Sequence, residues 1–303
     1  MKLGDYLKSF IGKPATERPS LAVQGGGMRG VYSVAALAAL EDAGLTKAFG
    51  RVGGSSAGAI NAAYFLAGQA NEGVSIYVDD LSASRFISFL RINKIVDIDY
   101  LVDVALRQHH PLDVAALRAS DSELLTTMTS VSTGEGVLAS SWDASLDAYE
   151  VMRATAALPG LYARQVQVGV DRYVDGGVVV PIPIPQVAPA LEDAVFAIFT
   201  RPIGNRRHGR SPFTRRLASA VLRVPPPVAA RMGAPDAEYN REVAQFEAVR
   251  ARRSGVKWGV WPSDGKRLAK RTTMSYDKLR DCARMAKEDV FDLLEEDFEL
   301  PVS

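Results

Sequence analysis

Two glycine-rich turns, each lying between an apolar stretch and a run of helix-forming residues, constrain the fold of this chain most. Residues 20–45, SLAVQGGGMRGVYSVAALAALEDAGL, predict a buried strand, a glycine turn and an alanine-rich helix that stops at Gly44. Residues 51–69, RVGGSSAGAINAAYFLAGQ, repeat this order with a short strand at Arg51 and Val52. Alternating strands and helices of this kind predict an α/β fold with a mainly parallel sheet covered by helices.

The middle of the chain adds further elements to this pattern. Residues 73–120 favour helix with polar interruptions. The segments that follow predict, in order, a hairpin over 123–140, a helix over 145–162 ended by Pro159 and Gly160, an antiparallel pair over 164–175 and an apolar strand over 193–202. The last of these is apolar throughout, which is typical of a strand inside a parallel sheet.

The composition changes at Arg201, where the chain becomes basic and rich in proline. An amphipathic helix is expected over 238–253, a strand over 258–264 and a charged helical tail over 276–298. We therefore expect a leader over 1–19, a catalytic core over 20–200, and a C-terminal part of the same domain over 201–303, with a basic loop and the helical tail.

Length and charge exclude several classes of protein. The chain has 303 residues, 47% of them hydrophobic, and a net charge of +1, which argues against a disordered or nucleic-acid-binding protein. Cys282 is the only cysteine, so no internal disulfide can form, and a small buried residue on a helix is expected there. We find no signal peptide and no membrane span, and expect a cytoplasmic protein whose membrane contact is peripheral.

The second glycine turn contains the pattern Gly-x-Ser-x-Gly at residues 54–58. This pattern is typical of a sharp strand-to-helix turn that presents a serine nucleophile between small residues. Gly54 and Gly58 place Ser56 at its centre, whereas a pattern centred on Ser55 would need glycine at position 57. The alternative is a glycine turn in which the serine only caps the helix.

The first glycine turn, QGGGMRG, has two interpretations. Gly25, Gly27 and Gly30 satisfy a nucleotide-binding spacing, but no acidic residue ends a strand about 20 positions later. The other interpretation is an oxyanion hole, in which the backbone N–H groups of Gly25, Gly26 and Gly27 face an anionic oxygen and Arg29 adds positive charge. Turns at the ends of adjacent parallel strands lie side by side, so one would supply the nucleophile and the other the donors.

A base for Ser56 is not obvious, because the chain has only three histidines. His109 and His110 precede a proline in a polar connection, and His208 lies among arginines. Asp175, at the end of an apolar strand and before two glycines, is the candidate base, although the ordinary pKa of an aspartate is near 4. Desolvation in a covered site would raise that pKa. The alternative is an aspartate that only caps its own turn.

These elements together resemble the patatin-like phospholipases. The resemblance rests on residues 25–30, residues 54–58, the small-residue block RATAALPG at 153–160, and residues 175–177, in that order. It implies a three-layer α/β/α fold and a Ser–Asp dyad that hydrolyses acyl esters of phospholipids or related glycerolipids. Carried to this sequence, it implies Ser56 as nucleophile, Asp175 as base, and an oxyanion hole at the glycine loop supported by Arg29. The sequence has no His/Cys cluster and no carboxylates at ligand spacing, so no metal or cofactor is expected.

Two segments are candidates for lipid contact. Residues 82–95 combine Phe86, Phe89 and Leu90 with basic residues and predict a bilayer contact or a lid, with a core-facing helix as the alternative. The second is a set of arginines that could meet anionic head groups or remain solvated: Arg201, Arg206, Arg207, Arg210, Arg215 and Arg216.

Two rival functions remain open. The order Ser56, Asp175, His208 also fits an α/β-hydrolase triad. A non-catalytic protein that binds a nucleotide phosphate with GGGMRG is the alternative from another class.

Overall fold

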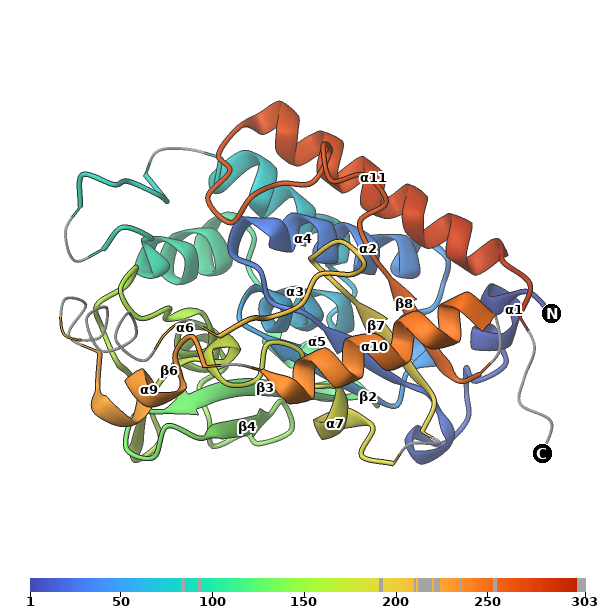
Figure 1. The fold of residues 1–303 in the computed structure, drawn as a ribbon, viewed down its shortest axis with the longest axis horizontal. Helices are drawn as coiled ribbons and strands as arrows, with labels where there is room; N and C mark the ends of the chain where they lie inside the picture. The colour runs from blue at the N-terminus through green and yellow to red at the C-terminus, as the bar shows by residue number, and fades with distance from the viewer. Residues whose placement is uncertain are drawn as a thin grey trace.

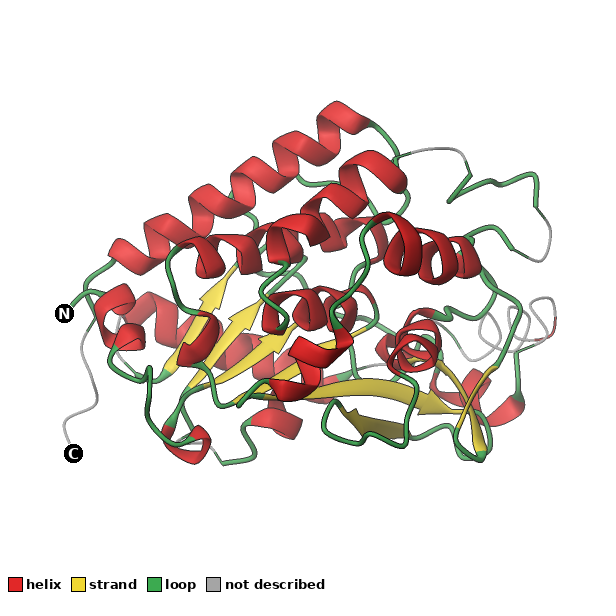
Figure 2. Ribbon diagram, turned by 180° about the vertical axis from the view of Figure 1, so that it is seen from behind, coloured by secondary structure: helices red, strands yellow, loops and turns green. Residues whose placement is uncertain are grey.

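The fold is built around one sheet. The computed structural model describes residues 1–82, 85–91, 94–190, 193–209, 211, 220, 224–234, 236–252 and 255–298 (Figure 1). Within this part of the chain the sheet has eight strands: β1 (Ser20–Val23), β2 (Arg51–Ser55), β3 (Glu123–Ser130), β4 (Gly136–Ser140), β5 (Val166–Val168), β6 (Asp171–Asp175), β7 (Val195–Ile198) and β8 (Lys257–Val260). Figure 2 shows the strands lying between helices.

The sheet is parallel through its centre and antiparallel at one end. The order is β5-β6-β3-β2-β1-β7-β8, and β4 pairs with β3 off this path. Strands β3, β2, β1, β7 and β8 run parallel, whereas β4, β6 and β5 form antiparallel pairs. The expected mainly parallel sheet, the hairpin over 123–140 and the strand after residue 193 are confirmed.

Helices cover both faces of the sheet. The α-helices are α1 (Leu3–Lys8), α2 (Gly30–Asp42), α3 (Ala57–Leu66), α4 (Ala70–Ser75), α5 (Val114–Ala119), α6 (Ala148–Ala156), α7 (Ile184–Val187), α9 (Pro226–Arg231), α10 (Ala237–Arg252) and α11 (Tyr276–Glu295). Single 3-10 turns lie at Ala15–Glu17, Gly27–Arg29, Thr46–Ala48 and Gly176–Val178. π-helical turns lie at Ile76–Asp80 and Tyr100–His109.

Alternate residues of the central strands point to two separate cores. Leu21 and Val23 pack on the face covered by α2, α3 and α11, whereas Ala22 packs on the face covered by α7 and α10. Because both faces are buried, β7 consists of four apolar residues and β1 of three after Ser20. The expected three-layer α/β/α arrangement is confirmed.

Helix α2 is buried on all sides because α11 lies over its outer face (Figure 1). The Tyr32 hydroxyl of α2 donates to Asp289 of α11 at 2.8 Å, which links the two helices. Leu3 and Leu7 of α1 are also fully buried, and α1 packs against α11. Cys282 is buried on α11, as expected, and burial raises the pKa of its thiol to about 11.

Strand β3 determines where β2 and β6 end. One edge of β3 is occupied by β4, which pairs continuously from Leu125 to Thr129. On the other edge β2 pairs as far as Thr127, opposite Ser55, and β6 pairs from Met128, opposite Asp175. The two strands therefore approach each other end to end along β3, and the residue after Ser55 comes next to Asp175.

Two sequence expectations need correction. Strand β2 does not stop at Val52 but continues through both glycines to Ser55. The described part of residues 82–95 is not a core-facing helix, because it forms turns and an antiparallel bridge between Ile87 and Val96. Residues 83, 84, 92 and 93 of this segment lie outside the described residues. No helix in the described ranges combines the length and apolar character needed to cross a bilayer.

The link between α2 and α11 can be tested with Tyr32→Phe. This change removes a partly buried hydrogen bond to a carboxylate, so the free energy of unfolding should fall by about 2 kcal/mol. Urea denaturation measures it. Tyr276→Phe is the matched control, since Tyr276 is 46% exposed on α11, and it should leave stability unchanged. If the two changes lowered the free energy of unfolding equally, the Tyr32–Asp289 hydrogen bond would not be the link that stabilises α2 against α11.

Candidate active site

Ser56 lies on a strained turn between β2 and α3. Its φ of 54° and ψ of −131° make it the one non-glycine residue with positive φ in the described part of the chain. The turn closes so tightly that a Cβ on Gly54 would lie 2.4 Å from Ala59 Cα, and one on Gly58 would lie 2.6 Å from Val23 O. Only glycine fits at these two positions, which explains the sequence pattern around Ser56.

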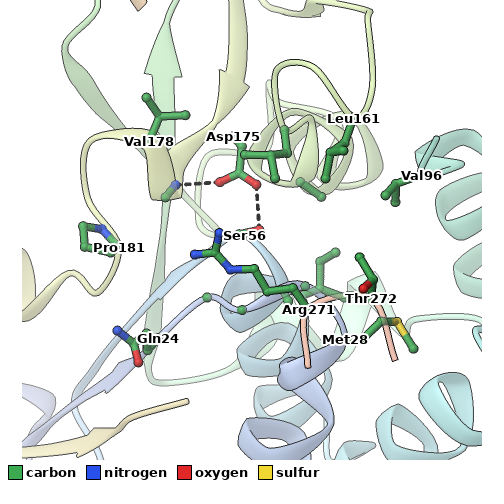
Figure 3. A pocket seen from close by; sticks show the side chains of 18 of the residues that line it. Gln24, Met28, Ser56, Val96, Leu161, Asp175, Val178, Pro181, Arg271 and Thr272 are labelled. Atoms are coloured by element: carbon green, nitrogen blue, oxygen red, sulfur yellow. Dashed lines mark hydrogen bonds between the residues drawn. The ribbon is translucent and has the colours of Figure 1, made fainter. Parts of the chain in front are cut away.

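The Ser56 hydroxyl does not cap α3 but points to Asp175. Its Oγ donates to Asp175 Oδ2 at 2.8 Å (Figure 3), and no side-chain cap is formed at the start of the helix. No other described side chain is hydrogen-bonded to this hydroxyl. The structure thus brings together the two residues that were predicted from separate glycine-flanked motifs.

Asp175 is held at the end of β6 by three further hydrogen bonds. The Gly177 N–H donates to Oδ1 at 2.7 Å, and the Thr129 hydroxyl donates to the Asp175 carbonyl at 2.9 Å. The Asp175 N–H donates to the Ala157 carbonyl at 3.1 Å. The carboxylate thus caps its own turn with one oxygen and keeps the other for Ser56.

The environment of Asp175 makes it a stronger base than an exposed aspartate. Burial raises the pKa of the Asp175 carboxyl to about 6, and the hydrogen bonds from Ser56 and Gly177 oppose that rise. The positive charges of Arg271 and Arg207 also lower the pKa of this carboxyl. The carboxylate is therefore ionised above about pH 6 and accepts a proton more readily than aspartate in water.

Thr155 is a residue of this site that the sequence reasoning missed. Its hydroxyl accepts from the Ser56 N–H at 2.9 Å and donates to the Thr127 carbonyl at 2.7 Å. Thr155 thereby fixes the strained Ser56 backbone to β3. In the sequence, the signal was a polar residue between two alanines in the small-residue block at 153–160. The structure shows that this residue is fully buried.

The glycine loop lies directly beside this turn. A Cβ on Gly25 would lie 2.6 Å from Ser55 O and 3.0 Å from Ser56 Cβ, which explains the glycine at this position. The Gly25 N–H donates to Pro181 O at 3.2 Å, so it is already engaged. The N–H groups of Gly26 and Gly27 have no acceptor among the described residues, and both residues line the cavity that contains Ser56.

The loop is anchored by two neighbours from distant parts of the chain. The Thr200 hydroxyl donates to Gly25 O at 2.8 Å, and the Arg271 carbonyl accepts from the Met28 N–H at 3.1 Å. Arg29 follows the loop, and its burial, together with the charges of Arg271 and Arg201, lowers the pKa of its guanidinium to about 9.

A cavity of about 650 Å³ opens over Ser56 and Asp175. Most of its wall is apolar and comes from α3, the π-helical turns and the segments around residues 86–98 and 156–162, including Ile60, Leu81, Phe86, Ile87, Val96, Leu101, Leu158, Leu161 and Tyr162. A second group of lining residues is cationic: Arg201, Arg206, Arg207, His208 and Arg271. The cavity therefore suits a ligand that has a long apolar part and a polar end.

The histidines are placed differently from one another. His109 and His110 both contact Asp80, at 2.5 Å and 3.0 Å, in a cluster that joins the two π-helical turns. His208 lines the cavity but is hydrogen-bonded to neither Ser56 nor Asp175. Within the described ranges no group of three or more His, Cys, Asp or Glu residues could hold a metal ion. Arg210, Arg215 and Arg216 lie outside the described residues.

Comparison with known proteins places the chain in a family. The model of the patatin-like phospholipase family matches residues 21–188, which is more than half of the chain. The uncharacterized protein YjjU of Escherichia coli (strain K12) is 27% identical over 175 residues, which cover 56% of this chain and 48% of YjjU. The chain thus matches about half the length of this curated relative.

Two solved structures resemble the chain in fold. VipD from Legionella pneumophila gives a TM-score of 0.53 at 13% identity, over 92% of this chain and 67% of that one. The type III effector protein ExoU gives a TM-score of 0.42 at 14% identity, over 91% and 53% of the two chains.

The buried Asp175 carboxylate predicts a pH-dependent stability. Its pKa is raised from 3.8 to about 6, so the folded state binds the proton more tightly and loses stability as pH rises from about 4 through 6. Asp175→Asn removes this loss and should be more stable than the native chain at pH 7.5, by up to about 3 kcal/mol. Urea denaturation at pH 4 and pH 7.5 measures the difference, which should shrink at the lower pH. A difference that is the same at both pH values would contradict the burial of an ionised carboxylate.

Proposed function

The chain belongs to the patatin-like phospholipase family, and on this premise we propose that it hydrolyses fatty-acyl esters of glycerolipids, with Ser56 as nucleophile and Asp175 as base. The observation that carries the proposal is the 2.8 Å hydrogen bond from Ser56 Oγ to Asp175 Oδ2 at the floor of a largely apolar cavity. The family's description supports a lipid hydrolase; the residue roles are inferred from geometry.

The reaction proceeds in two steps. Asp175 takes the proton of the Ser56 hydroxyl while Oγ attacks the ester carbonyl carbon, and the alcohol leaves with that proton, which gives an acyl-serine ester. Water then attacks the acyl carbonyl, Asp175 accepts its proton, and the proton passes to Ser56 as the fatty acid is released. A carboxylate with a pKa of about 6 is suited to both transfers near neutral pH.

The tetrahedral intermediate carries a negative oxygen that the glycine loop would stabilise. Gly26 and Gly27 are the donors we propose, because their N–H groups have no acceptor in the described part of the chain, whereas that of Gly25 is engaged. Arg29 supports the loop with its positive charge. One such donor is typically worth a factor of about 100 to 1000 in rate.

The rival functions receive less support from the same geometry. A Ser–Asp–His triad would need a histidine between serine and aspartate, but here the carboxylate contacts the hydroxyl directly. A nucleotide phosphate on the glycine loop would have to share the space beside Ser56, where the loop is in contact with the serine turn.

Substitution of the two residues tests the dyad. Ser56→Ala and Asp175→Asn should each lower fatty-acid release from mixed phospholipid vesicles by at least 1000-fold, and Ser56→Ala should abolish labelling by a fluorophosphonate. Ser55→Ala is the matched control: the Ser55 Oγ is buried without a hydrogen-bond partner, so activity should remain.

The same assay separates the rivals. His208→Ala should retain activity under the dyad and lose nearly all of it under a triad. Hydrolysis that survives Ser56→Ala would refute the proposal. Stabilisation of the protein by nucleotides, without labelling, would favour the nucleotide-binding alternative.

Membrane contact belongs to the same proposal. Phe89 is 69% exposed and Leu90 is 95% exposed, at the tip of the segment whose neighbours Phe86 and Ile87 line the cavity. Two of the nearby cations are already paired, since Arg91 and Lys94 both bind Asp97 at 2.9 Å, and the Arg85 guanidinium lies over the Tyr100 ring. We therefore propose that apolar insertion of this tip, rather than charge attraction, brings the cavity to the bilayer.

Replacing both tip residues tests this contact. Phe89→Ser with Leu90→Ser should lower the ratio of vesicle hydrolysis to hydrolysis of a water-soluble ester by roughly tenfold, because apolar area no longer enters the bilayer. Val170→Ser is the matched control, since Val170 is 94% exposed in the β5–β6 turn. A ratio that is unchanged in the double variant would exclude the tip as the contact.

A further inference from the structure

The polar end of the cavity wall is strongly cationic. Four arginines line the cavity, and Asp175 is the only carboxylate among its described lining residues. Two of the arginines are paired outward: Arg206 binds Glu247, and Arg207 binds Asp236 at 3.0 Å. These two ion pairs account for half of the arginines that line the cavity.

Arg201 differs from these neighbours. Its guanidinium donates to the neutral Asn205 Oδ1 at 2.9 Å, and no carboxylate in the described part of the chain pairs with it. Arg29, next to it, has a buried Nε without a hydrogen-bond partner. The two like charges are close enough that Arg201 lowers the pKa of Arg29. The buried charge of Arg29 beside other cations is unfavourable, and an anion bound at Arg201 would offset this repulsion.

Arg271 adds a third guanidinium to the same region. Figure 3 shows its side chain reaching from the segment after β8 toward Ser56, and Arg271 also lowers the pKa of Arg29. Its backbone carbonyl is fixed by the Met28 N–H, so the position of Arg271 is tied to the glycine loop. Arg201 and Arg271 therefore line the cavity that contains the dyad, whereas Arg29 is buried near them and does not line it.

We propose that Arg201 and Arg271 form a subsite for the phosphate of a glycerolipid head group, and that this subsite selects anionic over zwitterionic and neutral lipids. The inference rests on the proposed lipid hydrolysis and adds its head-group class. Guanidinium groups bind phosphate through paired, charge-assisted hydrogen bonds. A choline group would bring a cation toward the arginines, and an acylglycerol would bring no charge, so both leave the subsite unsatisfied. Arg201 and Arg271 lie outside the residues that match the family model, so this selectivity is a property of the C-terminal part of the chain.

Binding to the inactive Ser56→Ala protein tests the subsite without turnover. Calorimetric titration compares lysophosphatidic acid, lysophosphatidylcholine and monoacylglycerol with the same short acyl chain, below their critical micelle concentrations and at fixed ionic strength. We expect lysophosphatidic acid to bind at least tenfold more tightly than monoacylglycerol, with lysophosphatidylcholine between them.

Arg201→Gln in the same background should remove most of this tenfold preference, and Arg201→Lys should keep part of it. Arg241→Gln, at an exposed arginine of α10, is the matched control and should keep it all. Equal affinity for the three lipids, or an equal loss for all of them in Arg201→Gln, overturns the proposal. Inorganic phosphate that binds as tightly as lysophosphatidic acid would also overturn it, because the site would then recognise free phosphate rather than a head group.

The test separates the two proposals. Head-group discrimination by Ser56→Ala together with an inactive native chain would retain the subsite and refute the hydrolase. Hydrolysis by the native chain without head-group discrimination would retain the hydrolase and refute the subsite.

Discussion

The pairing of β3 with two strands along one edge is the constraint on which the site depends. Because β2 ends opposite Thr127 and β6 ends opposite Met128, strand pairing brings Ser56 and Asp175 together although they are 119 positions apart in sequence. Thr155 adds to this arrangement, since it ties the Ser56 N–H to the carbonyl of Thr127. A hydroxyl and a carboxylate that are fixed by sheet register need little reorganisation during a proton transfer, which is the condition for efficient catalysis by preorganised groups.

The buried carboxylate and the strained serine both lower the stability of the folded chain. A buried aspartate is unfavourable as an anion, and the hydrogen bonds from Ser56 and Gly177 compensate only part of that penalty, as the raised pKa of Asp175 indicates. The positive φ of Ser56 is a second local strain. Both are tolerated because the surrounding layers are fully packed: α2 is enclosed by α3 and α11, and the central strands are buried on both faces. The packing of these layers thus offsets the unfavourable free energy of the buried carboxylate and of the strained serine.

The sequence was sufficient for the elements whose causes are local. Gly54 and Gly58 predicted the turn at Ser56 because only a residue without Cβ fits there, and apolar strands predicted the buried sheet. It could not show that Thr155 holds the Ser56 backbone or that the Gly25 N–H is engaged by Pro181, because both contacts join segments that are distant in the chain. The segment near Phe89 was ambiguous for another reason: its apolar residues have no strict period, and two of them line the cavity while two face solvent.

The lining of the cavity is divided between two parts of the chain. The dyad and the glycine loop come from residues within the range matched by the family model, and so does most of the apolar wall. The cationic side comes from Arg201 and Arg271, on the segments that follow β7 and β8. Among the described contacts that hold these segments to the glycine loop are hydrogen bonds from Thr200 to Gln24 and Gly25 and one from the Met28 N–H to the Arg271 carbonyl. Under the two proposals, reactivity depends on the register of the sheet, whereas recognition of the polar end of the substrate depends on side chains that the sheet does not constrain.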